Sequence, residues 1–366
     1  MNSTEACIAL NMLPTIGPVR LRKLLQVFET PERVLSASGS ALRGVDGVGP
    51  EVAEQIVKWE STVDLASELQ RIREFGAKVI TAESEFYPKQ LREIHAPPIV
   101  LYVWGELTPR DQHAIGVVGS RRTTHYGAES AKKLSYQLAY AGMTVISGLA
   151  RGIDTAAHQG AIAAKGRTVA VIGSGLLNLY PPENAALAEK IAGGSGAVVS
   201  EFSMEVQPDR QTFPMRNRII SGWSQGILVV EAGLNSGALI TASQALEQGR
   251  SVYAVPGHIN APSAHGSNRL IQQGAKLVME ANDILDDLNI LLPDAKPVPE
   301  AAARQMPALT DDERRVYDAI EACETSIDDI TTKSDLPSGS VSSTLLRLEL
   351  KRLVKQLPGK YFVKLG

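Results

Sequence analysis

The sequence predicts an α/β protein with a mostly parallel central sheet that carries helices on both faces. Between residues 113 and 287, short apolar segments alternate with helical runs rich in Ala, Leu, Glu and Lys. Strands that are apolar throughout are typical of sheets covered on both faces. Many of these strands run into loops of Gly, Ser and Arg. Right-handed crossovers bring such loops to one edge of the sheet, so we predict a Rossmann-like fold with a binding edge.

Length and composition are those of an ordinary globular protein. The 366 residues are enough for two or three domains, and the formal net charge is −3. The two cysteines, Cys7 and Cys323, lie far apart and lack metal-ligand spacing, which favours a reducing compartment. The sequence has no apolar run near the roughly 20 residues of a membrane span, and no signal peptide. We therefore expect a cytoplasmic protein without a membrane partner.

Residues 1–75 are predicted to form a helical domain with two related hairpins. The first hairpin is LPTIGP at 13–18 and the second is VDGVGP at 45–50, and each precedes a helical run. This is a helix-hairpin-helix pattern, in which glycine permits the turn and free N–H groups can meet a DNA phosphate. A small packing domain without DNA contacts explains the pattern equally well. If one hairpin binds DNA, the basic residues that follow it favour the first: Arg20, Arg22 and Lys23.

Residues 76–290 are predicted to form the Rossmann-like domain. Two strands in a connector at 76–112 precede the alternating region, and Pro97 and Pro98 fix the entry to the second of them. The predicted strands are 78–81, 99–105, 115–119, 144–147, 168–173, 197–201, 226–232, 251–257 and 276–279.

The stretch 115–158 carries most of the chemistry. Twice a strand there enters a loop of Gly, Ser and Arg and a helix follows, which is a typical site for phosphate oxygen. Similar loops follow the later strands. Several phosphate-compatible loops along one edge suit a ligand with phosphates in a row, such as a nucleic-acid backbone. Between 110 and 290 we count 15 Lys/Arg and 14 Asp/Glu, so affinity must depend on a few placed arginines.

The C-terminal part is predicted to be a linker followed by a winged helix. Residues 291–307 contain prolines and alanines typical of a semi-extended linker. In 308–366 the order is helix, helix, turn, helix and hairpin, with the third helix at 338–352 and a wing strand at 360–365. Six basic residues between 347 and 364 favour nucleic-acid binding, whereas the many acids of the same domain favour protein interaction.

The central motifs resemble those of the DNA-processing protein A family, DprA or Smf. They occur in order from about 85 to 287, and the flanks resemble the longer members, with a SAM-like helical domain in front and a winged helix behind. The motifs are GVVGSRRTTHYG, SGLARGIDTAAHQGA, TVAVIGSG, LYPPEN, SEF, FPMRNRIISG, VVEAGLNSGALITASQALEQGR and AVPGH with GSNRLIQQGA.

The resemblance implies a cytosolic, non-enzymatic single-stranded DNA-binding protein of natural transformation. Such a protein protects incoming strands, helps load the RecA recombinase, forms a homodimer and needs no cofactor. Carried over by motif, the residues implied to bind DNA are Ser120, Arg121, Ser147, Gly148, Ala150, Arg151, Gly152, Phe213, Arg216, Asn217, Arg218, Ser236, Gly237 and Thr241.

Within this set we expect Arg121, Arg151 and Arg216 to be functional and hold the others more loosely. Asp154 and His158 are expected to shape the start of the helix after the second loop, where Asp is a favoured cap. Phe213 is a candidate for base stacking, and the alternative is a core position. Glu231 follows a buried strand and is expected to be structural.

The competing prediction is a nucleotide-processing enzyme of the phosphoribohydrolase type. Those enzymes carry a PGGxGTxxE motif whose glutamate helps to cleave an N-glycosidic bond. Here the corresponding run is EAGLNSGALITASQA, and no acid stands in the first turns of its helix. Because acid–base catalysis there needs a carboxylate, its absence favours binding. The histidines show no metal-ligand spacing, and no Walker loop or nucleophile elbow is present. A regulator that binds duplex DNA through the winged helix would leave the sheet edge without a role.

Overall fold

The chain forms two compact units, residues 1–298 and 299–366. The computed structural model describes residues 1–288, 309–321, 324–351 and 353–365. The predicted linker at 291–307 lies outside the described residues.

The first unit is built on one sheet that contains the strands predicted for the Rossmann-like domain. Within residues 1–288 its order is β1-β2-β6-β5-β4-β3-β7-β8-β9. From β6 to β9 every neighbouring pair is parallel, while β2 pairs antiparallel with both β1 and β6. The mostly parallel sheet confirms the predicted fold class. The strands are β1 (Lys78–Thr81), β2 (Val100–Gly105), β3 (Ala114–Val118), β4 (Thr144–Ser147), β5 (Thr168–Val171), β6 (Gly196–Ser200), β7 (Gly226–Val229), β8 (Ser251–Ala254) and β9 (Lys276–Leu277).

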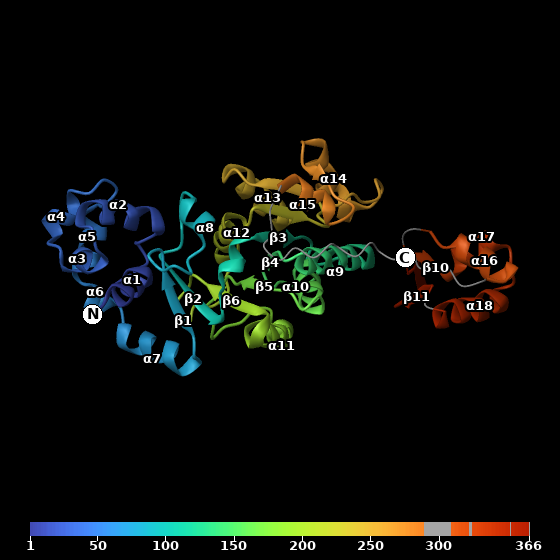
Figure 1. Ribbon diagram of the computed structural model, residues 1–366, viewed down its shortest axis with the longest axis horizontal. Helices are drawn as coiled ribbons and strands as arrows, with labels where there is room; N and C mark the ends of the chain where they lie inside the picture. The colour runs from blue at the N-terminus through green and yellow to red at the C-terminus, as the bar shows by residue number, and fades with distance from the viewer. Residues whose placement is uncertain (289–308, 322–323, 352, 366) are drawn as a thin grey trace. The chain divides into compact units, whose positions relative to one another are not determined.

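Successive residues of each central strand enter different cores because side chains alternate across a sheet. In β5, Val169 and Val171 share a core with α12 and α13, whereas Ala170 belongs to the core on the other face, which also contains the N-terminal helices. Helices α9 and α10 cover β3 and β4 on that second face (Figure 1). The helices and helical turns of this region are α8 (Lys89–Glu93), η1 (Pro109–Gln112), α9 (His125–Tyr140), α10 (Ile153–Ala163), η2 (Pro182–Asn184), α11 (Ala185–Lys190), η3 (Ile191–Ser195), α12 (Thr212–Trp223), α13 (Gly237–Glu247), η4 (Pro262–Ala264), α14 (His265–Gln272) and α15 (Asn282–Leu288).

The N-terminal helices pack directly on the sheet end formed by β1, β2 and β6 (Figure 1). Their buried residues share one core with Tyr102 and Val198 of these strands. Two hydrogen bonds add to this contact: the Asn11 side-chain amide donates to the Glu201 carbonyl, and the Met204 N–H donates to the buried Glu68 carboxylate. The helices are α1 (Ser3–Met12), α2 (Pro18–Phe28), α3 (Pro31–Ser36), α4 (Gly39–Arg43), α5 (Pro50–Val57), α6 (Trp59–Thr62) and α7 (Leu65–Phe75).

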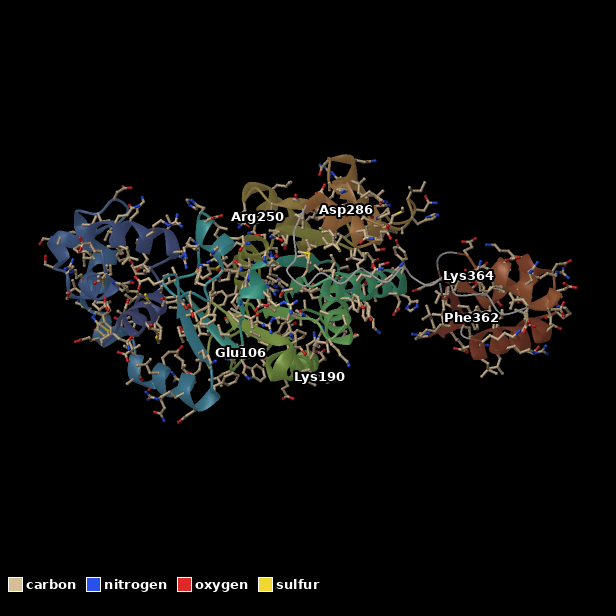
Figure 2. All side chains as sticks on the ribbon, viewed as in Figure 1. Glu106, Lys190, Arg250, Asp286, Phe362 and Lys364 are labelled. Carbon is tan, nitrogen blue, oxygen red and sulfur yellow. The ribbon has the colours of Figure 1, made fainter. Side chains whose placement is uncertain are left out.

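Arg250 joins three elements on the α12 face of the sheet (Figure 2). It follows α13, and its guanidinium donates to the carbonyls of Gln90 in α8 and Gly222 in α12. Gly222 leaves no room for a Cβ against Ile94 and Leu91, so α12 and α8 approach closely. This packing holds α12 in place along the carboxyl edge of the sheet.

The second unit has the predicted winged-helix order. Its elements are α16 (Asp311–Ala319), β10 (Thr325–Ser326), α17 (Ile327–Ser334), α18 (Ser338–Leu350), β11 (Val354–Leu357) and β12 (Tyr361–Lys364). The strands form a small antiparallel sheet in the order β10-β12-β11. Phe362 enters the core with Val316 and Leu345, and Lys364 lies over the Tyr317 ring at 4.8 Å (Figure 2).

Candidate nucleic-acid interface

A cleft of about 790 Å³ lies where the strand order of the central sheet reverses. Strands β4, β5 and β6 continue from β3 to one side, and β7, β8 and β9 lie on the other side. Ligands of open α/β sheets bind at the carboxyl ends of the strands at such a switch point. The cleft is lined by the loop after β3, the loop after β7, the start of α13 and the first turns of α12.

The loop after β3 presents two arginines to the cleft. The Ser120 hydroxyl accepts from the Arg122 N–H at 3.1 Å and donates to the Arg122 carbonyl, which makes a tight turn. The Ser120 N–H donates to the Glu231 carbonyl at 2.7 Å and fixes the loop to β7. Arg121 and Arg122 are exposed and line the cleft. Neither forms an ion pair with another described residue, so their charges are available to an anion.

The helix that follows this loop begins on an internal carboxylate. Glu231 is 3% exposed, and its Oε2 accepts from the Thr123 hydroxyl at 2.6 Å and the Thr124 N–H at 2.9 Å. These residues precede α9, whose N-terminus favours a negative charge. Glu231 therefore has the structural role expected of it. Glu231 thus lies beside the helix N-terminus at which a phosphate is expected, and the phosphate site in this loop stays a prediction.

The loop after β4 is closed in the same way. The Asp154 carboxylate accepts from the N–H groups of Gly148 at 3.1 Å and Ala150 at 3.3 Å. The pKa of Asp154 is raised by burial, and this effect outweighs the lowering by Arg216 and these two amides. The Ser147 side chain is fully buried and donates to the Val117 carbonyl at 2.6 Å. The three residues Ser147, Gly148 and Ala150 therefore have internal hydrogen-bond partners, although Ala150 also lines the cleft. That they cradle a phosphate stays a prediction.

Gly152 allows the first two loops to cross. Its φ of +78° lies in the region that favours glycine, and a Cβ there would clash with the Ser120 carbonyl oxygen. The Ile153 N–H donates to the same oxygen at 3.2 Å. Gly152 thus holds the Arg121 loop against the start of α10, and the cleft lining does not include it.

The three predicted residues Arg216, Asn217 and Arg218 divide between the cleft and the surrounding structure. Arg216 is 4% exposed, and its guanidinium packs against Gly148 and donates to the Val171 carbonyl. Burial lowers its pKa to about 10. Asn217 lines the cleft with Arg216, whereas Arg218 pairs with the buried Glu201 and lies outside the lining. Arg216 is therefore a charge in the cleft floor.

Phe213 is the aromatic residue of the cleft. Its ring centroid lies 4.9 Å from Arg121 Cζ and 5.8 Å from the Tyr180 ring. An arginine over an aromatic face is attracted to the ring electrons. Arg121 thus lies over the Phe213 ring, and a positive charge and an aromatic ring share this part of the cleft.

The start of α13 is an exposed helix N-terminus in the cleft lining. Ser236 caps it by accepting from the Ala238 N–H at 3.3 Å. Gly237 is exposed and has no atom within 4 Å of the place where a Cβ would stand. Thr241 is buried one turn later and lines the cleft. Ser236, Gly237 and Thr241 therefore lie together, as predicted from their shared motif.

Arg151 and His158 have other partners. Arg151 is exposed, pairs with Glu183 at 2.5 Å and lies outside the cleft lining. His158 is fully buried with its Nδ1 2.7 Å from the Thr168 hydroxyl of β5, and burial lowers its pKa to about 3. It does not bond back to the loop before α10, because its ring points toward β5.

Comparison with known proteins identifies the family. The sequence model of the family "DNA recombination-mediator protein A" matches residues 78–289, which is more than half of the chain. The chain belongs to this family. Two further models match on either side: a SAM-like helix-hairpin-helix tandem at 8–58 and the DprA winged helix domain at 300–360.

Relatives from several bacteria resemble this chain over most of its length. Protein Smf of Synechocystis sp. is 34% identical over 98% of each chain. The crystal structure of DNA processing protein A from Streptococcus pneumoniae has a TM-score of 0.70 and 34% identity, and covers 78% of this chain and 98% of its own. The structure of DNA processing protein A from Helicobacter pylori, solved for its single-stranded DNA binding mode, has a TM-score of 0.52 and 27% identity. It covers 61% of this chain and 99% of its own.

Two exposed arginines of the cleft were not among the residues carried over by motif. Arg122 follows Arg121 in the same loop, and Arg210 lies on the segment that leads into α12. Both are exposed, and neither forms an ion pair with another described residue. Arg210 stands outside the recognised motifs, and its only sequence signal is a cation three residues before Phe213.

The predicted hairpins hold each other through their cations. Arg20 donates to the carbonyls of Thr15 in the first hairpin and Gly47 in the second. Lys23 pairs with Asp46 at 2.6 Å. Arg22 donates to the Ile94 carbonyl before β2 at 3.0 Å. All three cations on which the preference for the first hairpin depended therefore have internal partners.

Membrane-spanning helices and metal-binding clusters are both missing from the part of the chain that the structure describes. Across those ranges no helix combines the length and apolar character needed to cross a bilayer. Nor does any group of three or more His, Cys, Asp or Glu side chains stand in a metal-binding arrangement among the same residues.

Proposed function

We propose that this protein binds single-stranded DNA across the carboxyl edge of its central sheet and acts in natural transformation. The observation that carries the proposal is the grouping of Arg121, Arg122 and Arg210 around one cleft without ion-pair partners among the described residues. Single-strand binders combine positive charge along a groove with aromatic surfaces for the bases. The family membership and the single-stranded DNA binding of the H. pylori relative support the same function.

In this proposal the phosphates and the bases take different parts of the cleft. The phosphates lie against Arg121, Arg122 and Arg210, and one reaches the exposed N–H groups at Gly237. Phe213 stacks on a base, and such stacking is worth roughly 1–3 kcal/mol. Asn217 and Thr241 offer polar side chains within the cleft. Since stacking accepts any base, sequence preference is weak.

We infer that the cleft binds DNA and does not catalyse a reaction on it. The cleft carboxylate, Asp154, is already bonded to two backbone amides, and Glu231 lies behind the first loop. The residues after Gly237 that line the cleft are Ala238, Ile240 and Thr241. A glutamate at this point would be needed for phosphoribohydrolase chemistry.

The resemblance extends the proposal to the fate of the strand. We propose that the protein works in the cytoplasm as a homodimer, protects the incoming strand and helps to load RecA onto it. A dimer would bring two clefts to one strand, and binding of the second would then be intramolecular.

The experiment is a fluorescence-anisotropy titration of the full chain with labelled oligo-dT and with a duplex of equal length, at two salt concentrations. We expect tighter, salt-sensitive binding to the single strand. Equal or tighter binding to the duplex would move the site to the winged helix or the hairpins. Absence of binding to both strands would favour the alternative of a nucleotide-processing enzyme.

A further inference from the structure

We propose that Tyr180 and Arg151 form a second nucleotide subsite, next to the cleft and beyond Phe213. The proposal rests on the function proposed above, because it extends the path of the same strand. Phe213 lines the cleft, and its ring also contacts the Tyr180 ring at 5.8 Å between centroids. Tyr180 itself is 38% exposed and lies outside the cleft lining. On a strand that extends past Phe213, the next base therefore meets a second aromatic surface.

The loop that carries Tyr180 is held at both ends. On one side, the Asn178 side-chain amide donates to the Glu205 carbonyl at 2.7 Å. On the other side, the buried Asn184 donates to the Leu149 carbonyl at 2.7 Å and to the Thr155 hydroxyl at 2.9 Å. Tyr180 thus stands on a fixed platform, which lowers the entropy lost when a base stacks on it.

Arg151 supplies the phosphate contact of this subsite. It pairs with Glu183, three residues after Tyr180 on the same loop, at 2.5 Å. The side chains of Arg151 and Glu183 are 56% and 58% exposed. Exposed pairs of this kind contribute little stability, so a phosphate can replace the carboxylate at low cost. The ion pair thus holds Arg151 against the loop that carries Tyr180 and neutralises its charge until a strand arrives.

The alternative is that Tyr180 only positions Phe213. A purely positioning role would change binding at the cleft whatever the length of the strand. A second subsite contributes only when the strand is long enough to extend past Phe213. The length dependence of the variant's effect therefore separates the two.

The test compares Tyr180→Ala with the parent on two labelled oligo-dT strands, of roughly 4 and about 16 nucleotides, the span of known single-strand site sizes. We expect Tyr180→Ala to weaken binding of the long strand roughly 5- to 100-fold, the loss of one stacked base, and to leave the short strand unchanged. Tyr180→Phe keeps the ring and should bind both strands like the parent. Leu177→Ala, an exposed residue of the same loop, is the matched control.

Two more variants give independent readouts. In Tyr180→Trp, stacking should quench the new indole fluorescence with the long strand and not with the short one. In Glu183→Gln, removal of the competing charge from Arg151 should tighten the long strand roughly 2- to 5-fold.

The outcomes separate this inference from the proposed function. If the parent binds neither strand, the proposed function fails. If the parent binds both and Tyr180→Ala matches it on the long strand, the second subsite is refuted. Equal weakening on both strands would also overturn it and leave Tyr180 as a positioning residue for Phe213. Thermal unfolding of each variant checks that the fold is intact.

Discussion

The cleft and the N-terminal hairpins both combine glycine turns with basic residues, and they use these residues differently. In the hairpins, Arg20 donates to the Gly47 carbonyl and Lys23 pairs with Asp46. In the cleft, Arg121 and Arg122 make no ion pair with a described residue, although Arg121 contacts the Phe213 ring. The hairpin cations join parts of the protein, whereas the cleft cations are available to a ligand.

A second contrast lies inside the cleft. Glu231 accepts from the Thr124 N–H just before α9, and Asp154 accepts from two amides of the loop before α10, while α13 is capped by the neutral Ser236. In these first two loops an internal carboxylate thus takes backbone N–H groups that a phosphate would otherwise use. The loop before α13 has no such carboxylate at its cap.

The largest effect should come from removing two cleft arginines together. We expect the double variant Arg121→Ala/Arg210→Ala to weaken oligo-dT binding on the order of 100-fold or more, because each substitution removes a charged contact to a phosphate. Anisotropy titration at low salt measures it. Lys132→Ala/Lys133→Ala makes the same charge change on the exposed side of α9 and should leave binding within a few-fold. If both double variants lose the same affinity, general charge and not the cleft explains binding.

The next effect concerns the cleft floor. Arg216→Met removes a buried charge that offsets Asp154 and leaves the Val171 carbonyl without its donor. We expect the free energy of unfolding to fall by about 2–4 kcal/mol, measured by urea denaturation followed by circular dichroism. Unchanged stability together with lost DNA binding would show instead that Arg216 acts mainly as a ligand contact.

A pH effect should come from His158. Its pKa is lowered from 6.5 to about 3 by burial, so below pH 6.5 the unfolded chain binds a proton that the folded chain does not. His158 therefore makes stability fall as the pH is lowered through this window, by at most about 1.4 kcal/mol per pH unit. His158→Gln should flatten the dependence between pH 6.5 and about 4, relative to the parent. An equally steep profile in the variant would assign acid sensitivity to other groups.

The smallest effect should come from the hairpins. Lys23→Ala removes a largely exposed ion pair, so we expect little or no change in the free energy of unfolding. Its affinity for oligo-dT should match that of the parent in the same titration. A clear loss of affinity would show that the hairpin cation exchanges Asp46 for DNA.

Sequence patterns predicted the sheet and the winged helix because their signals are local. Apolar strands such as 168–173 and the turn before α18 can be recognised without knowing their partners. The use of each polar group could not be predicted, because it depends on tertiary neighbours. Asp46 follows Lys23 by more than twenty residues, and Glu231 meets Thr124 across more than a hundred. Arg210 belongs to no motif and is brought to the cleft by the path into α12.

The most direct test of DNA binding in the cleft is the salt dependence of oligo-dT binding in the parent, Arg121→Ala and Lys23→Ala. Each phosphate contact to a single strand contributes roughly 0.7 to the slope of log affinity against log salt. We expect Arg121→Ala to lower the slope by about that amount and Lys23→Ala to retain the parent's slope. An unchanged slope in Arg121→Ala, or an equal reduction in Lys23→Ala, would contradict the assignment of the DNA backbone to the cleft.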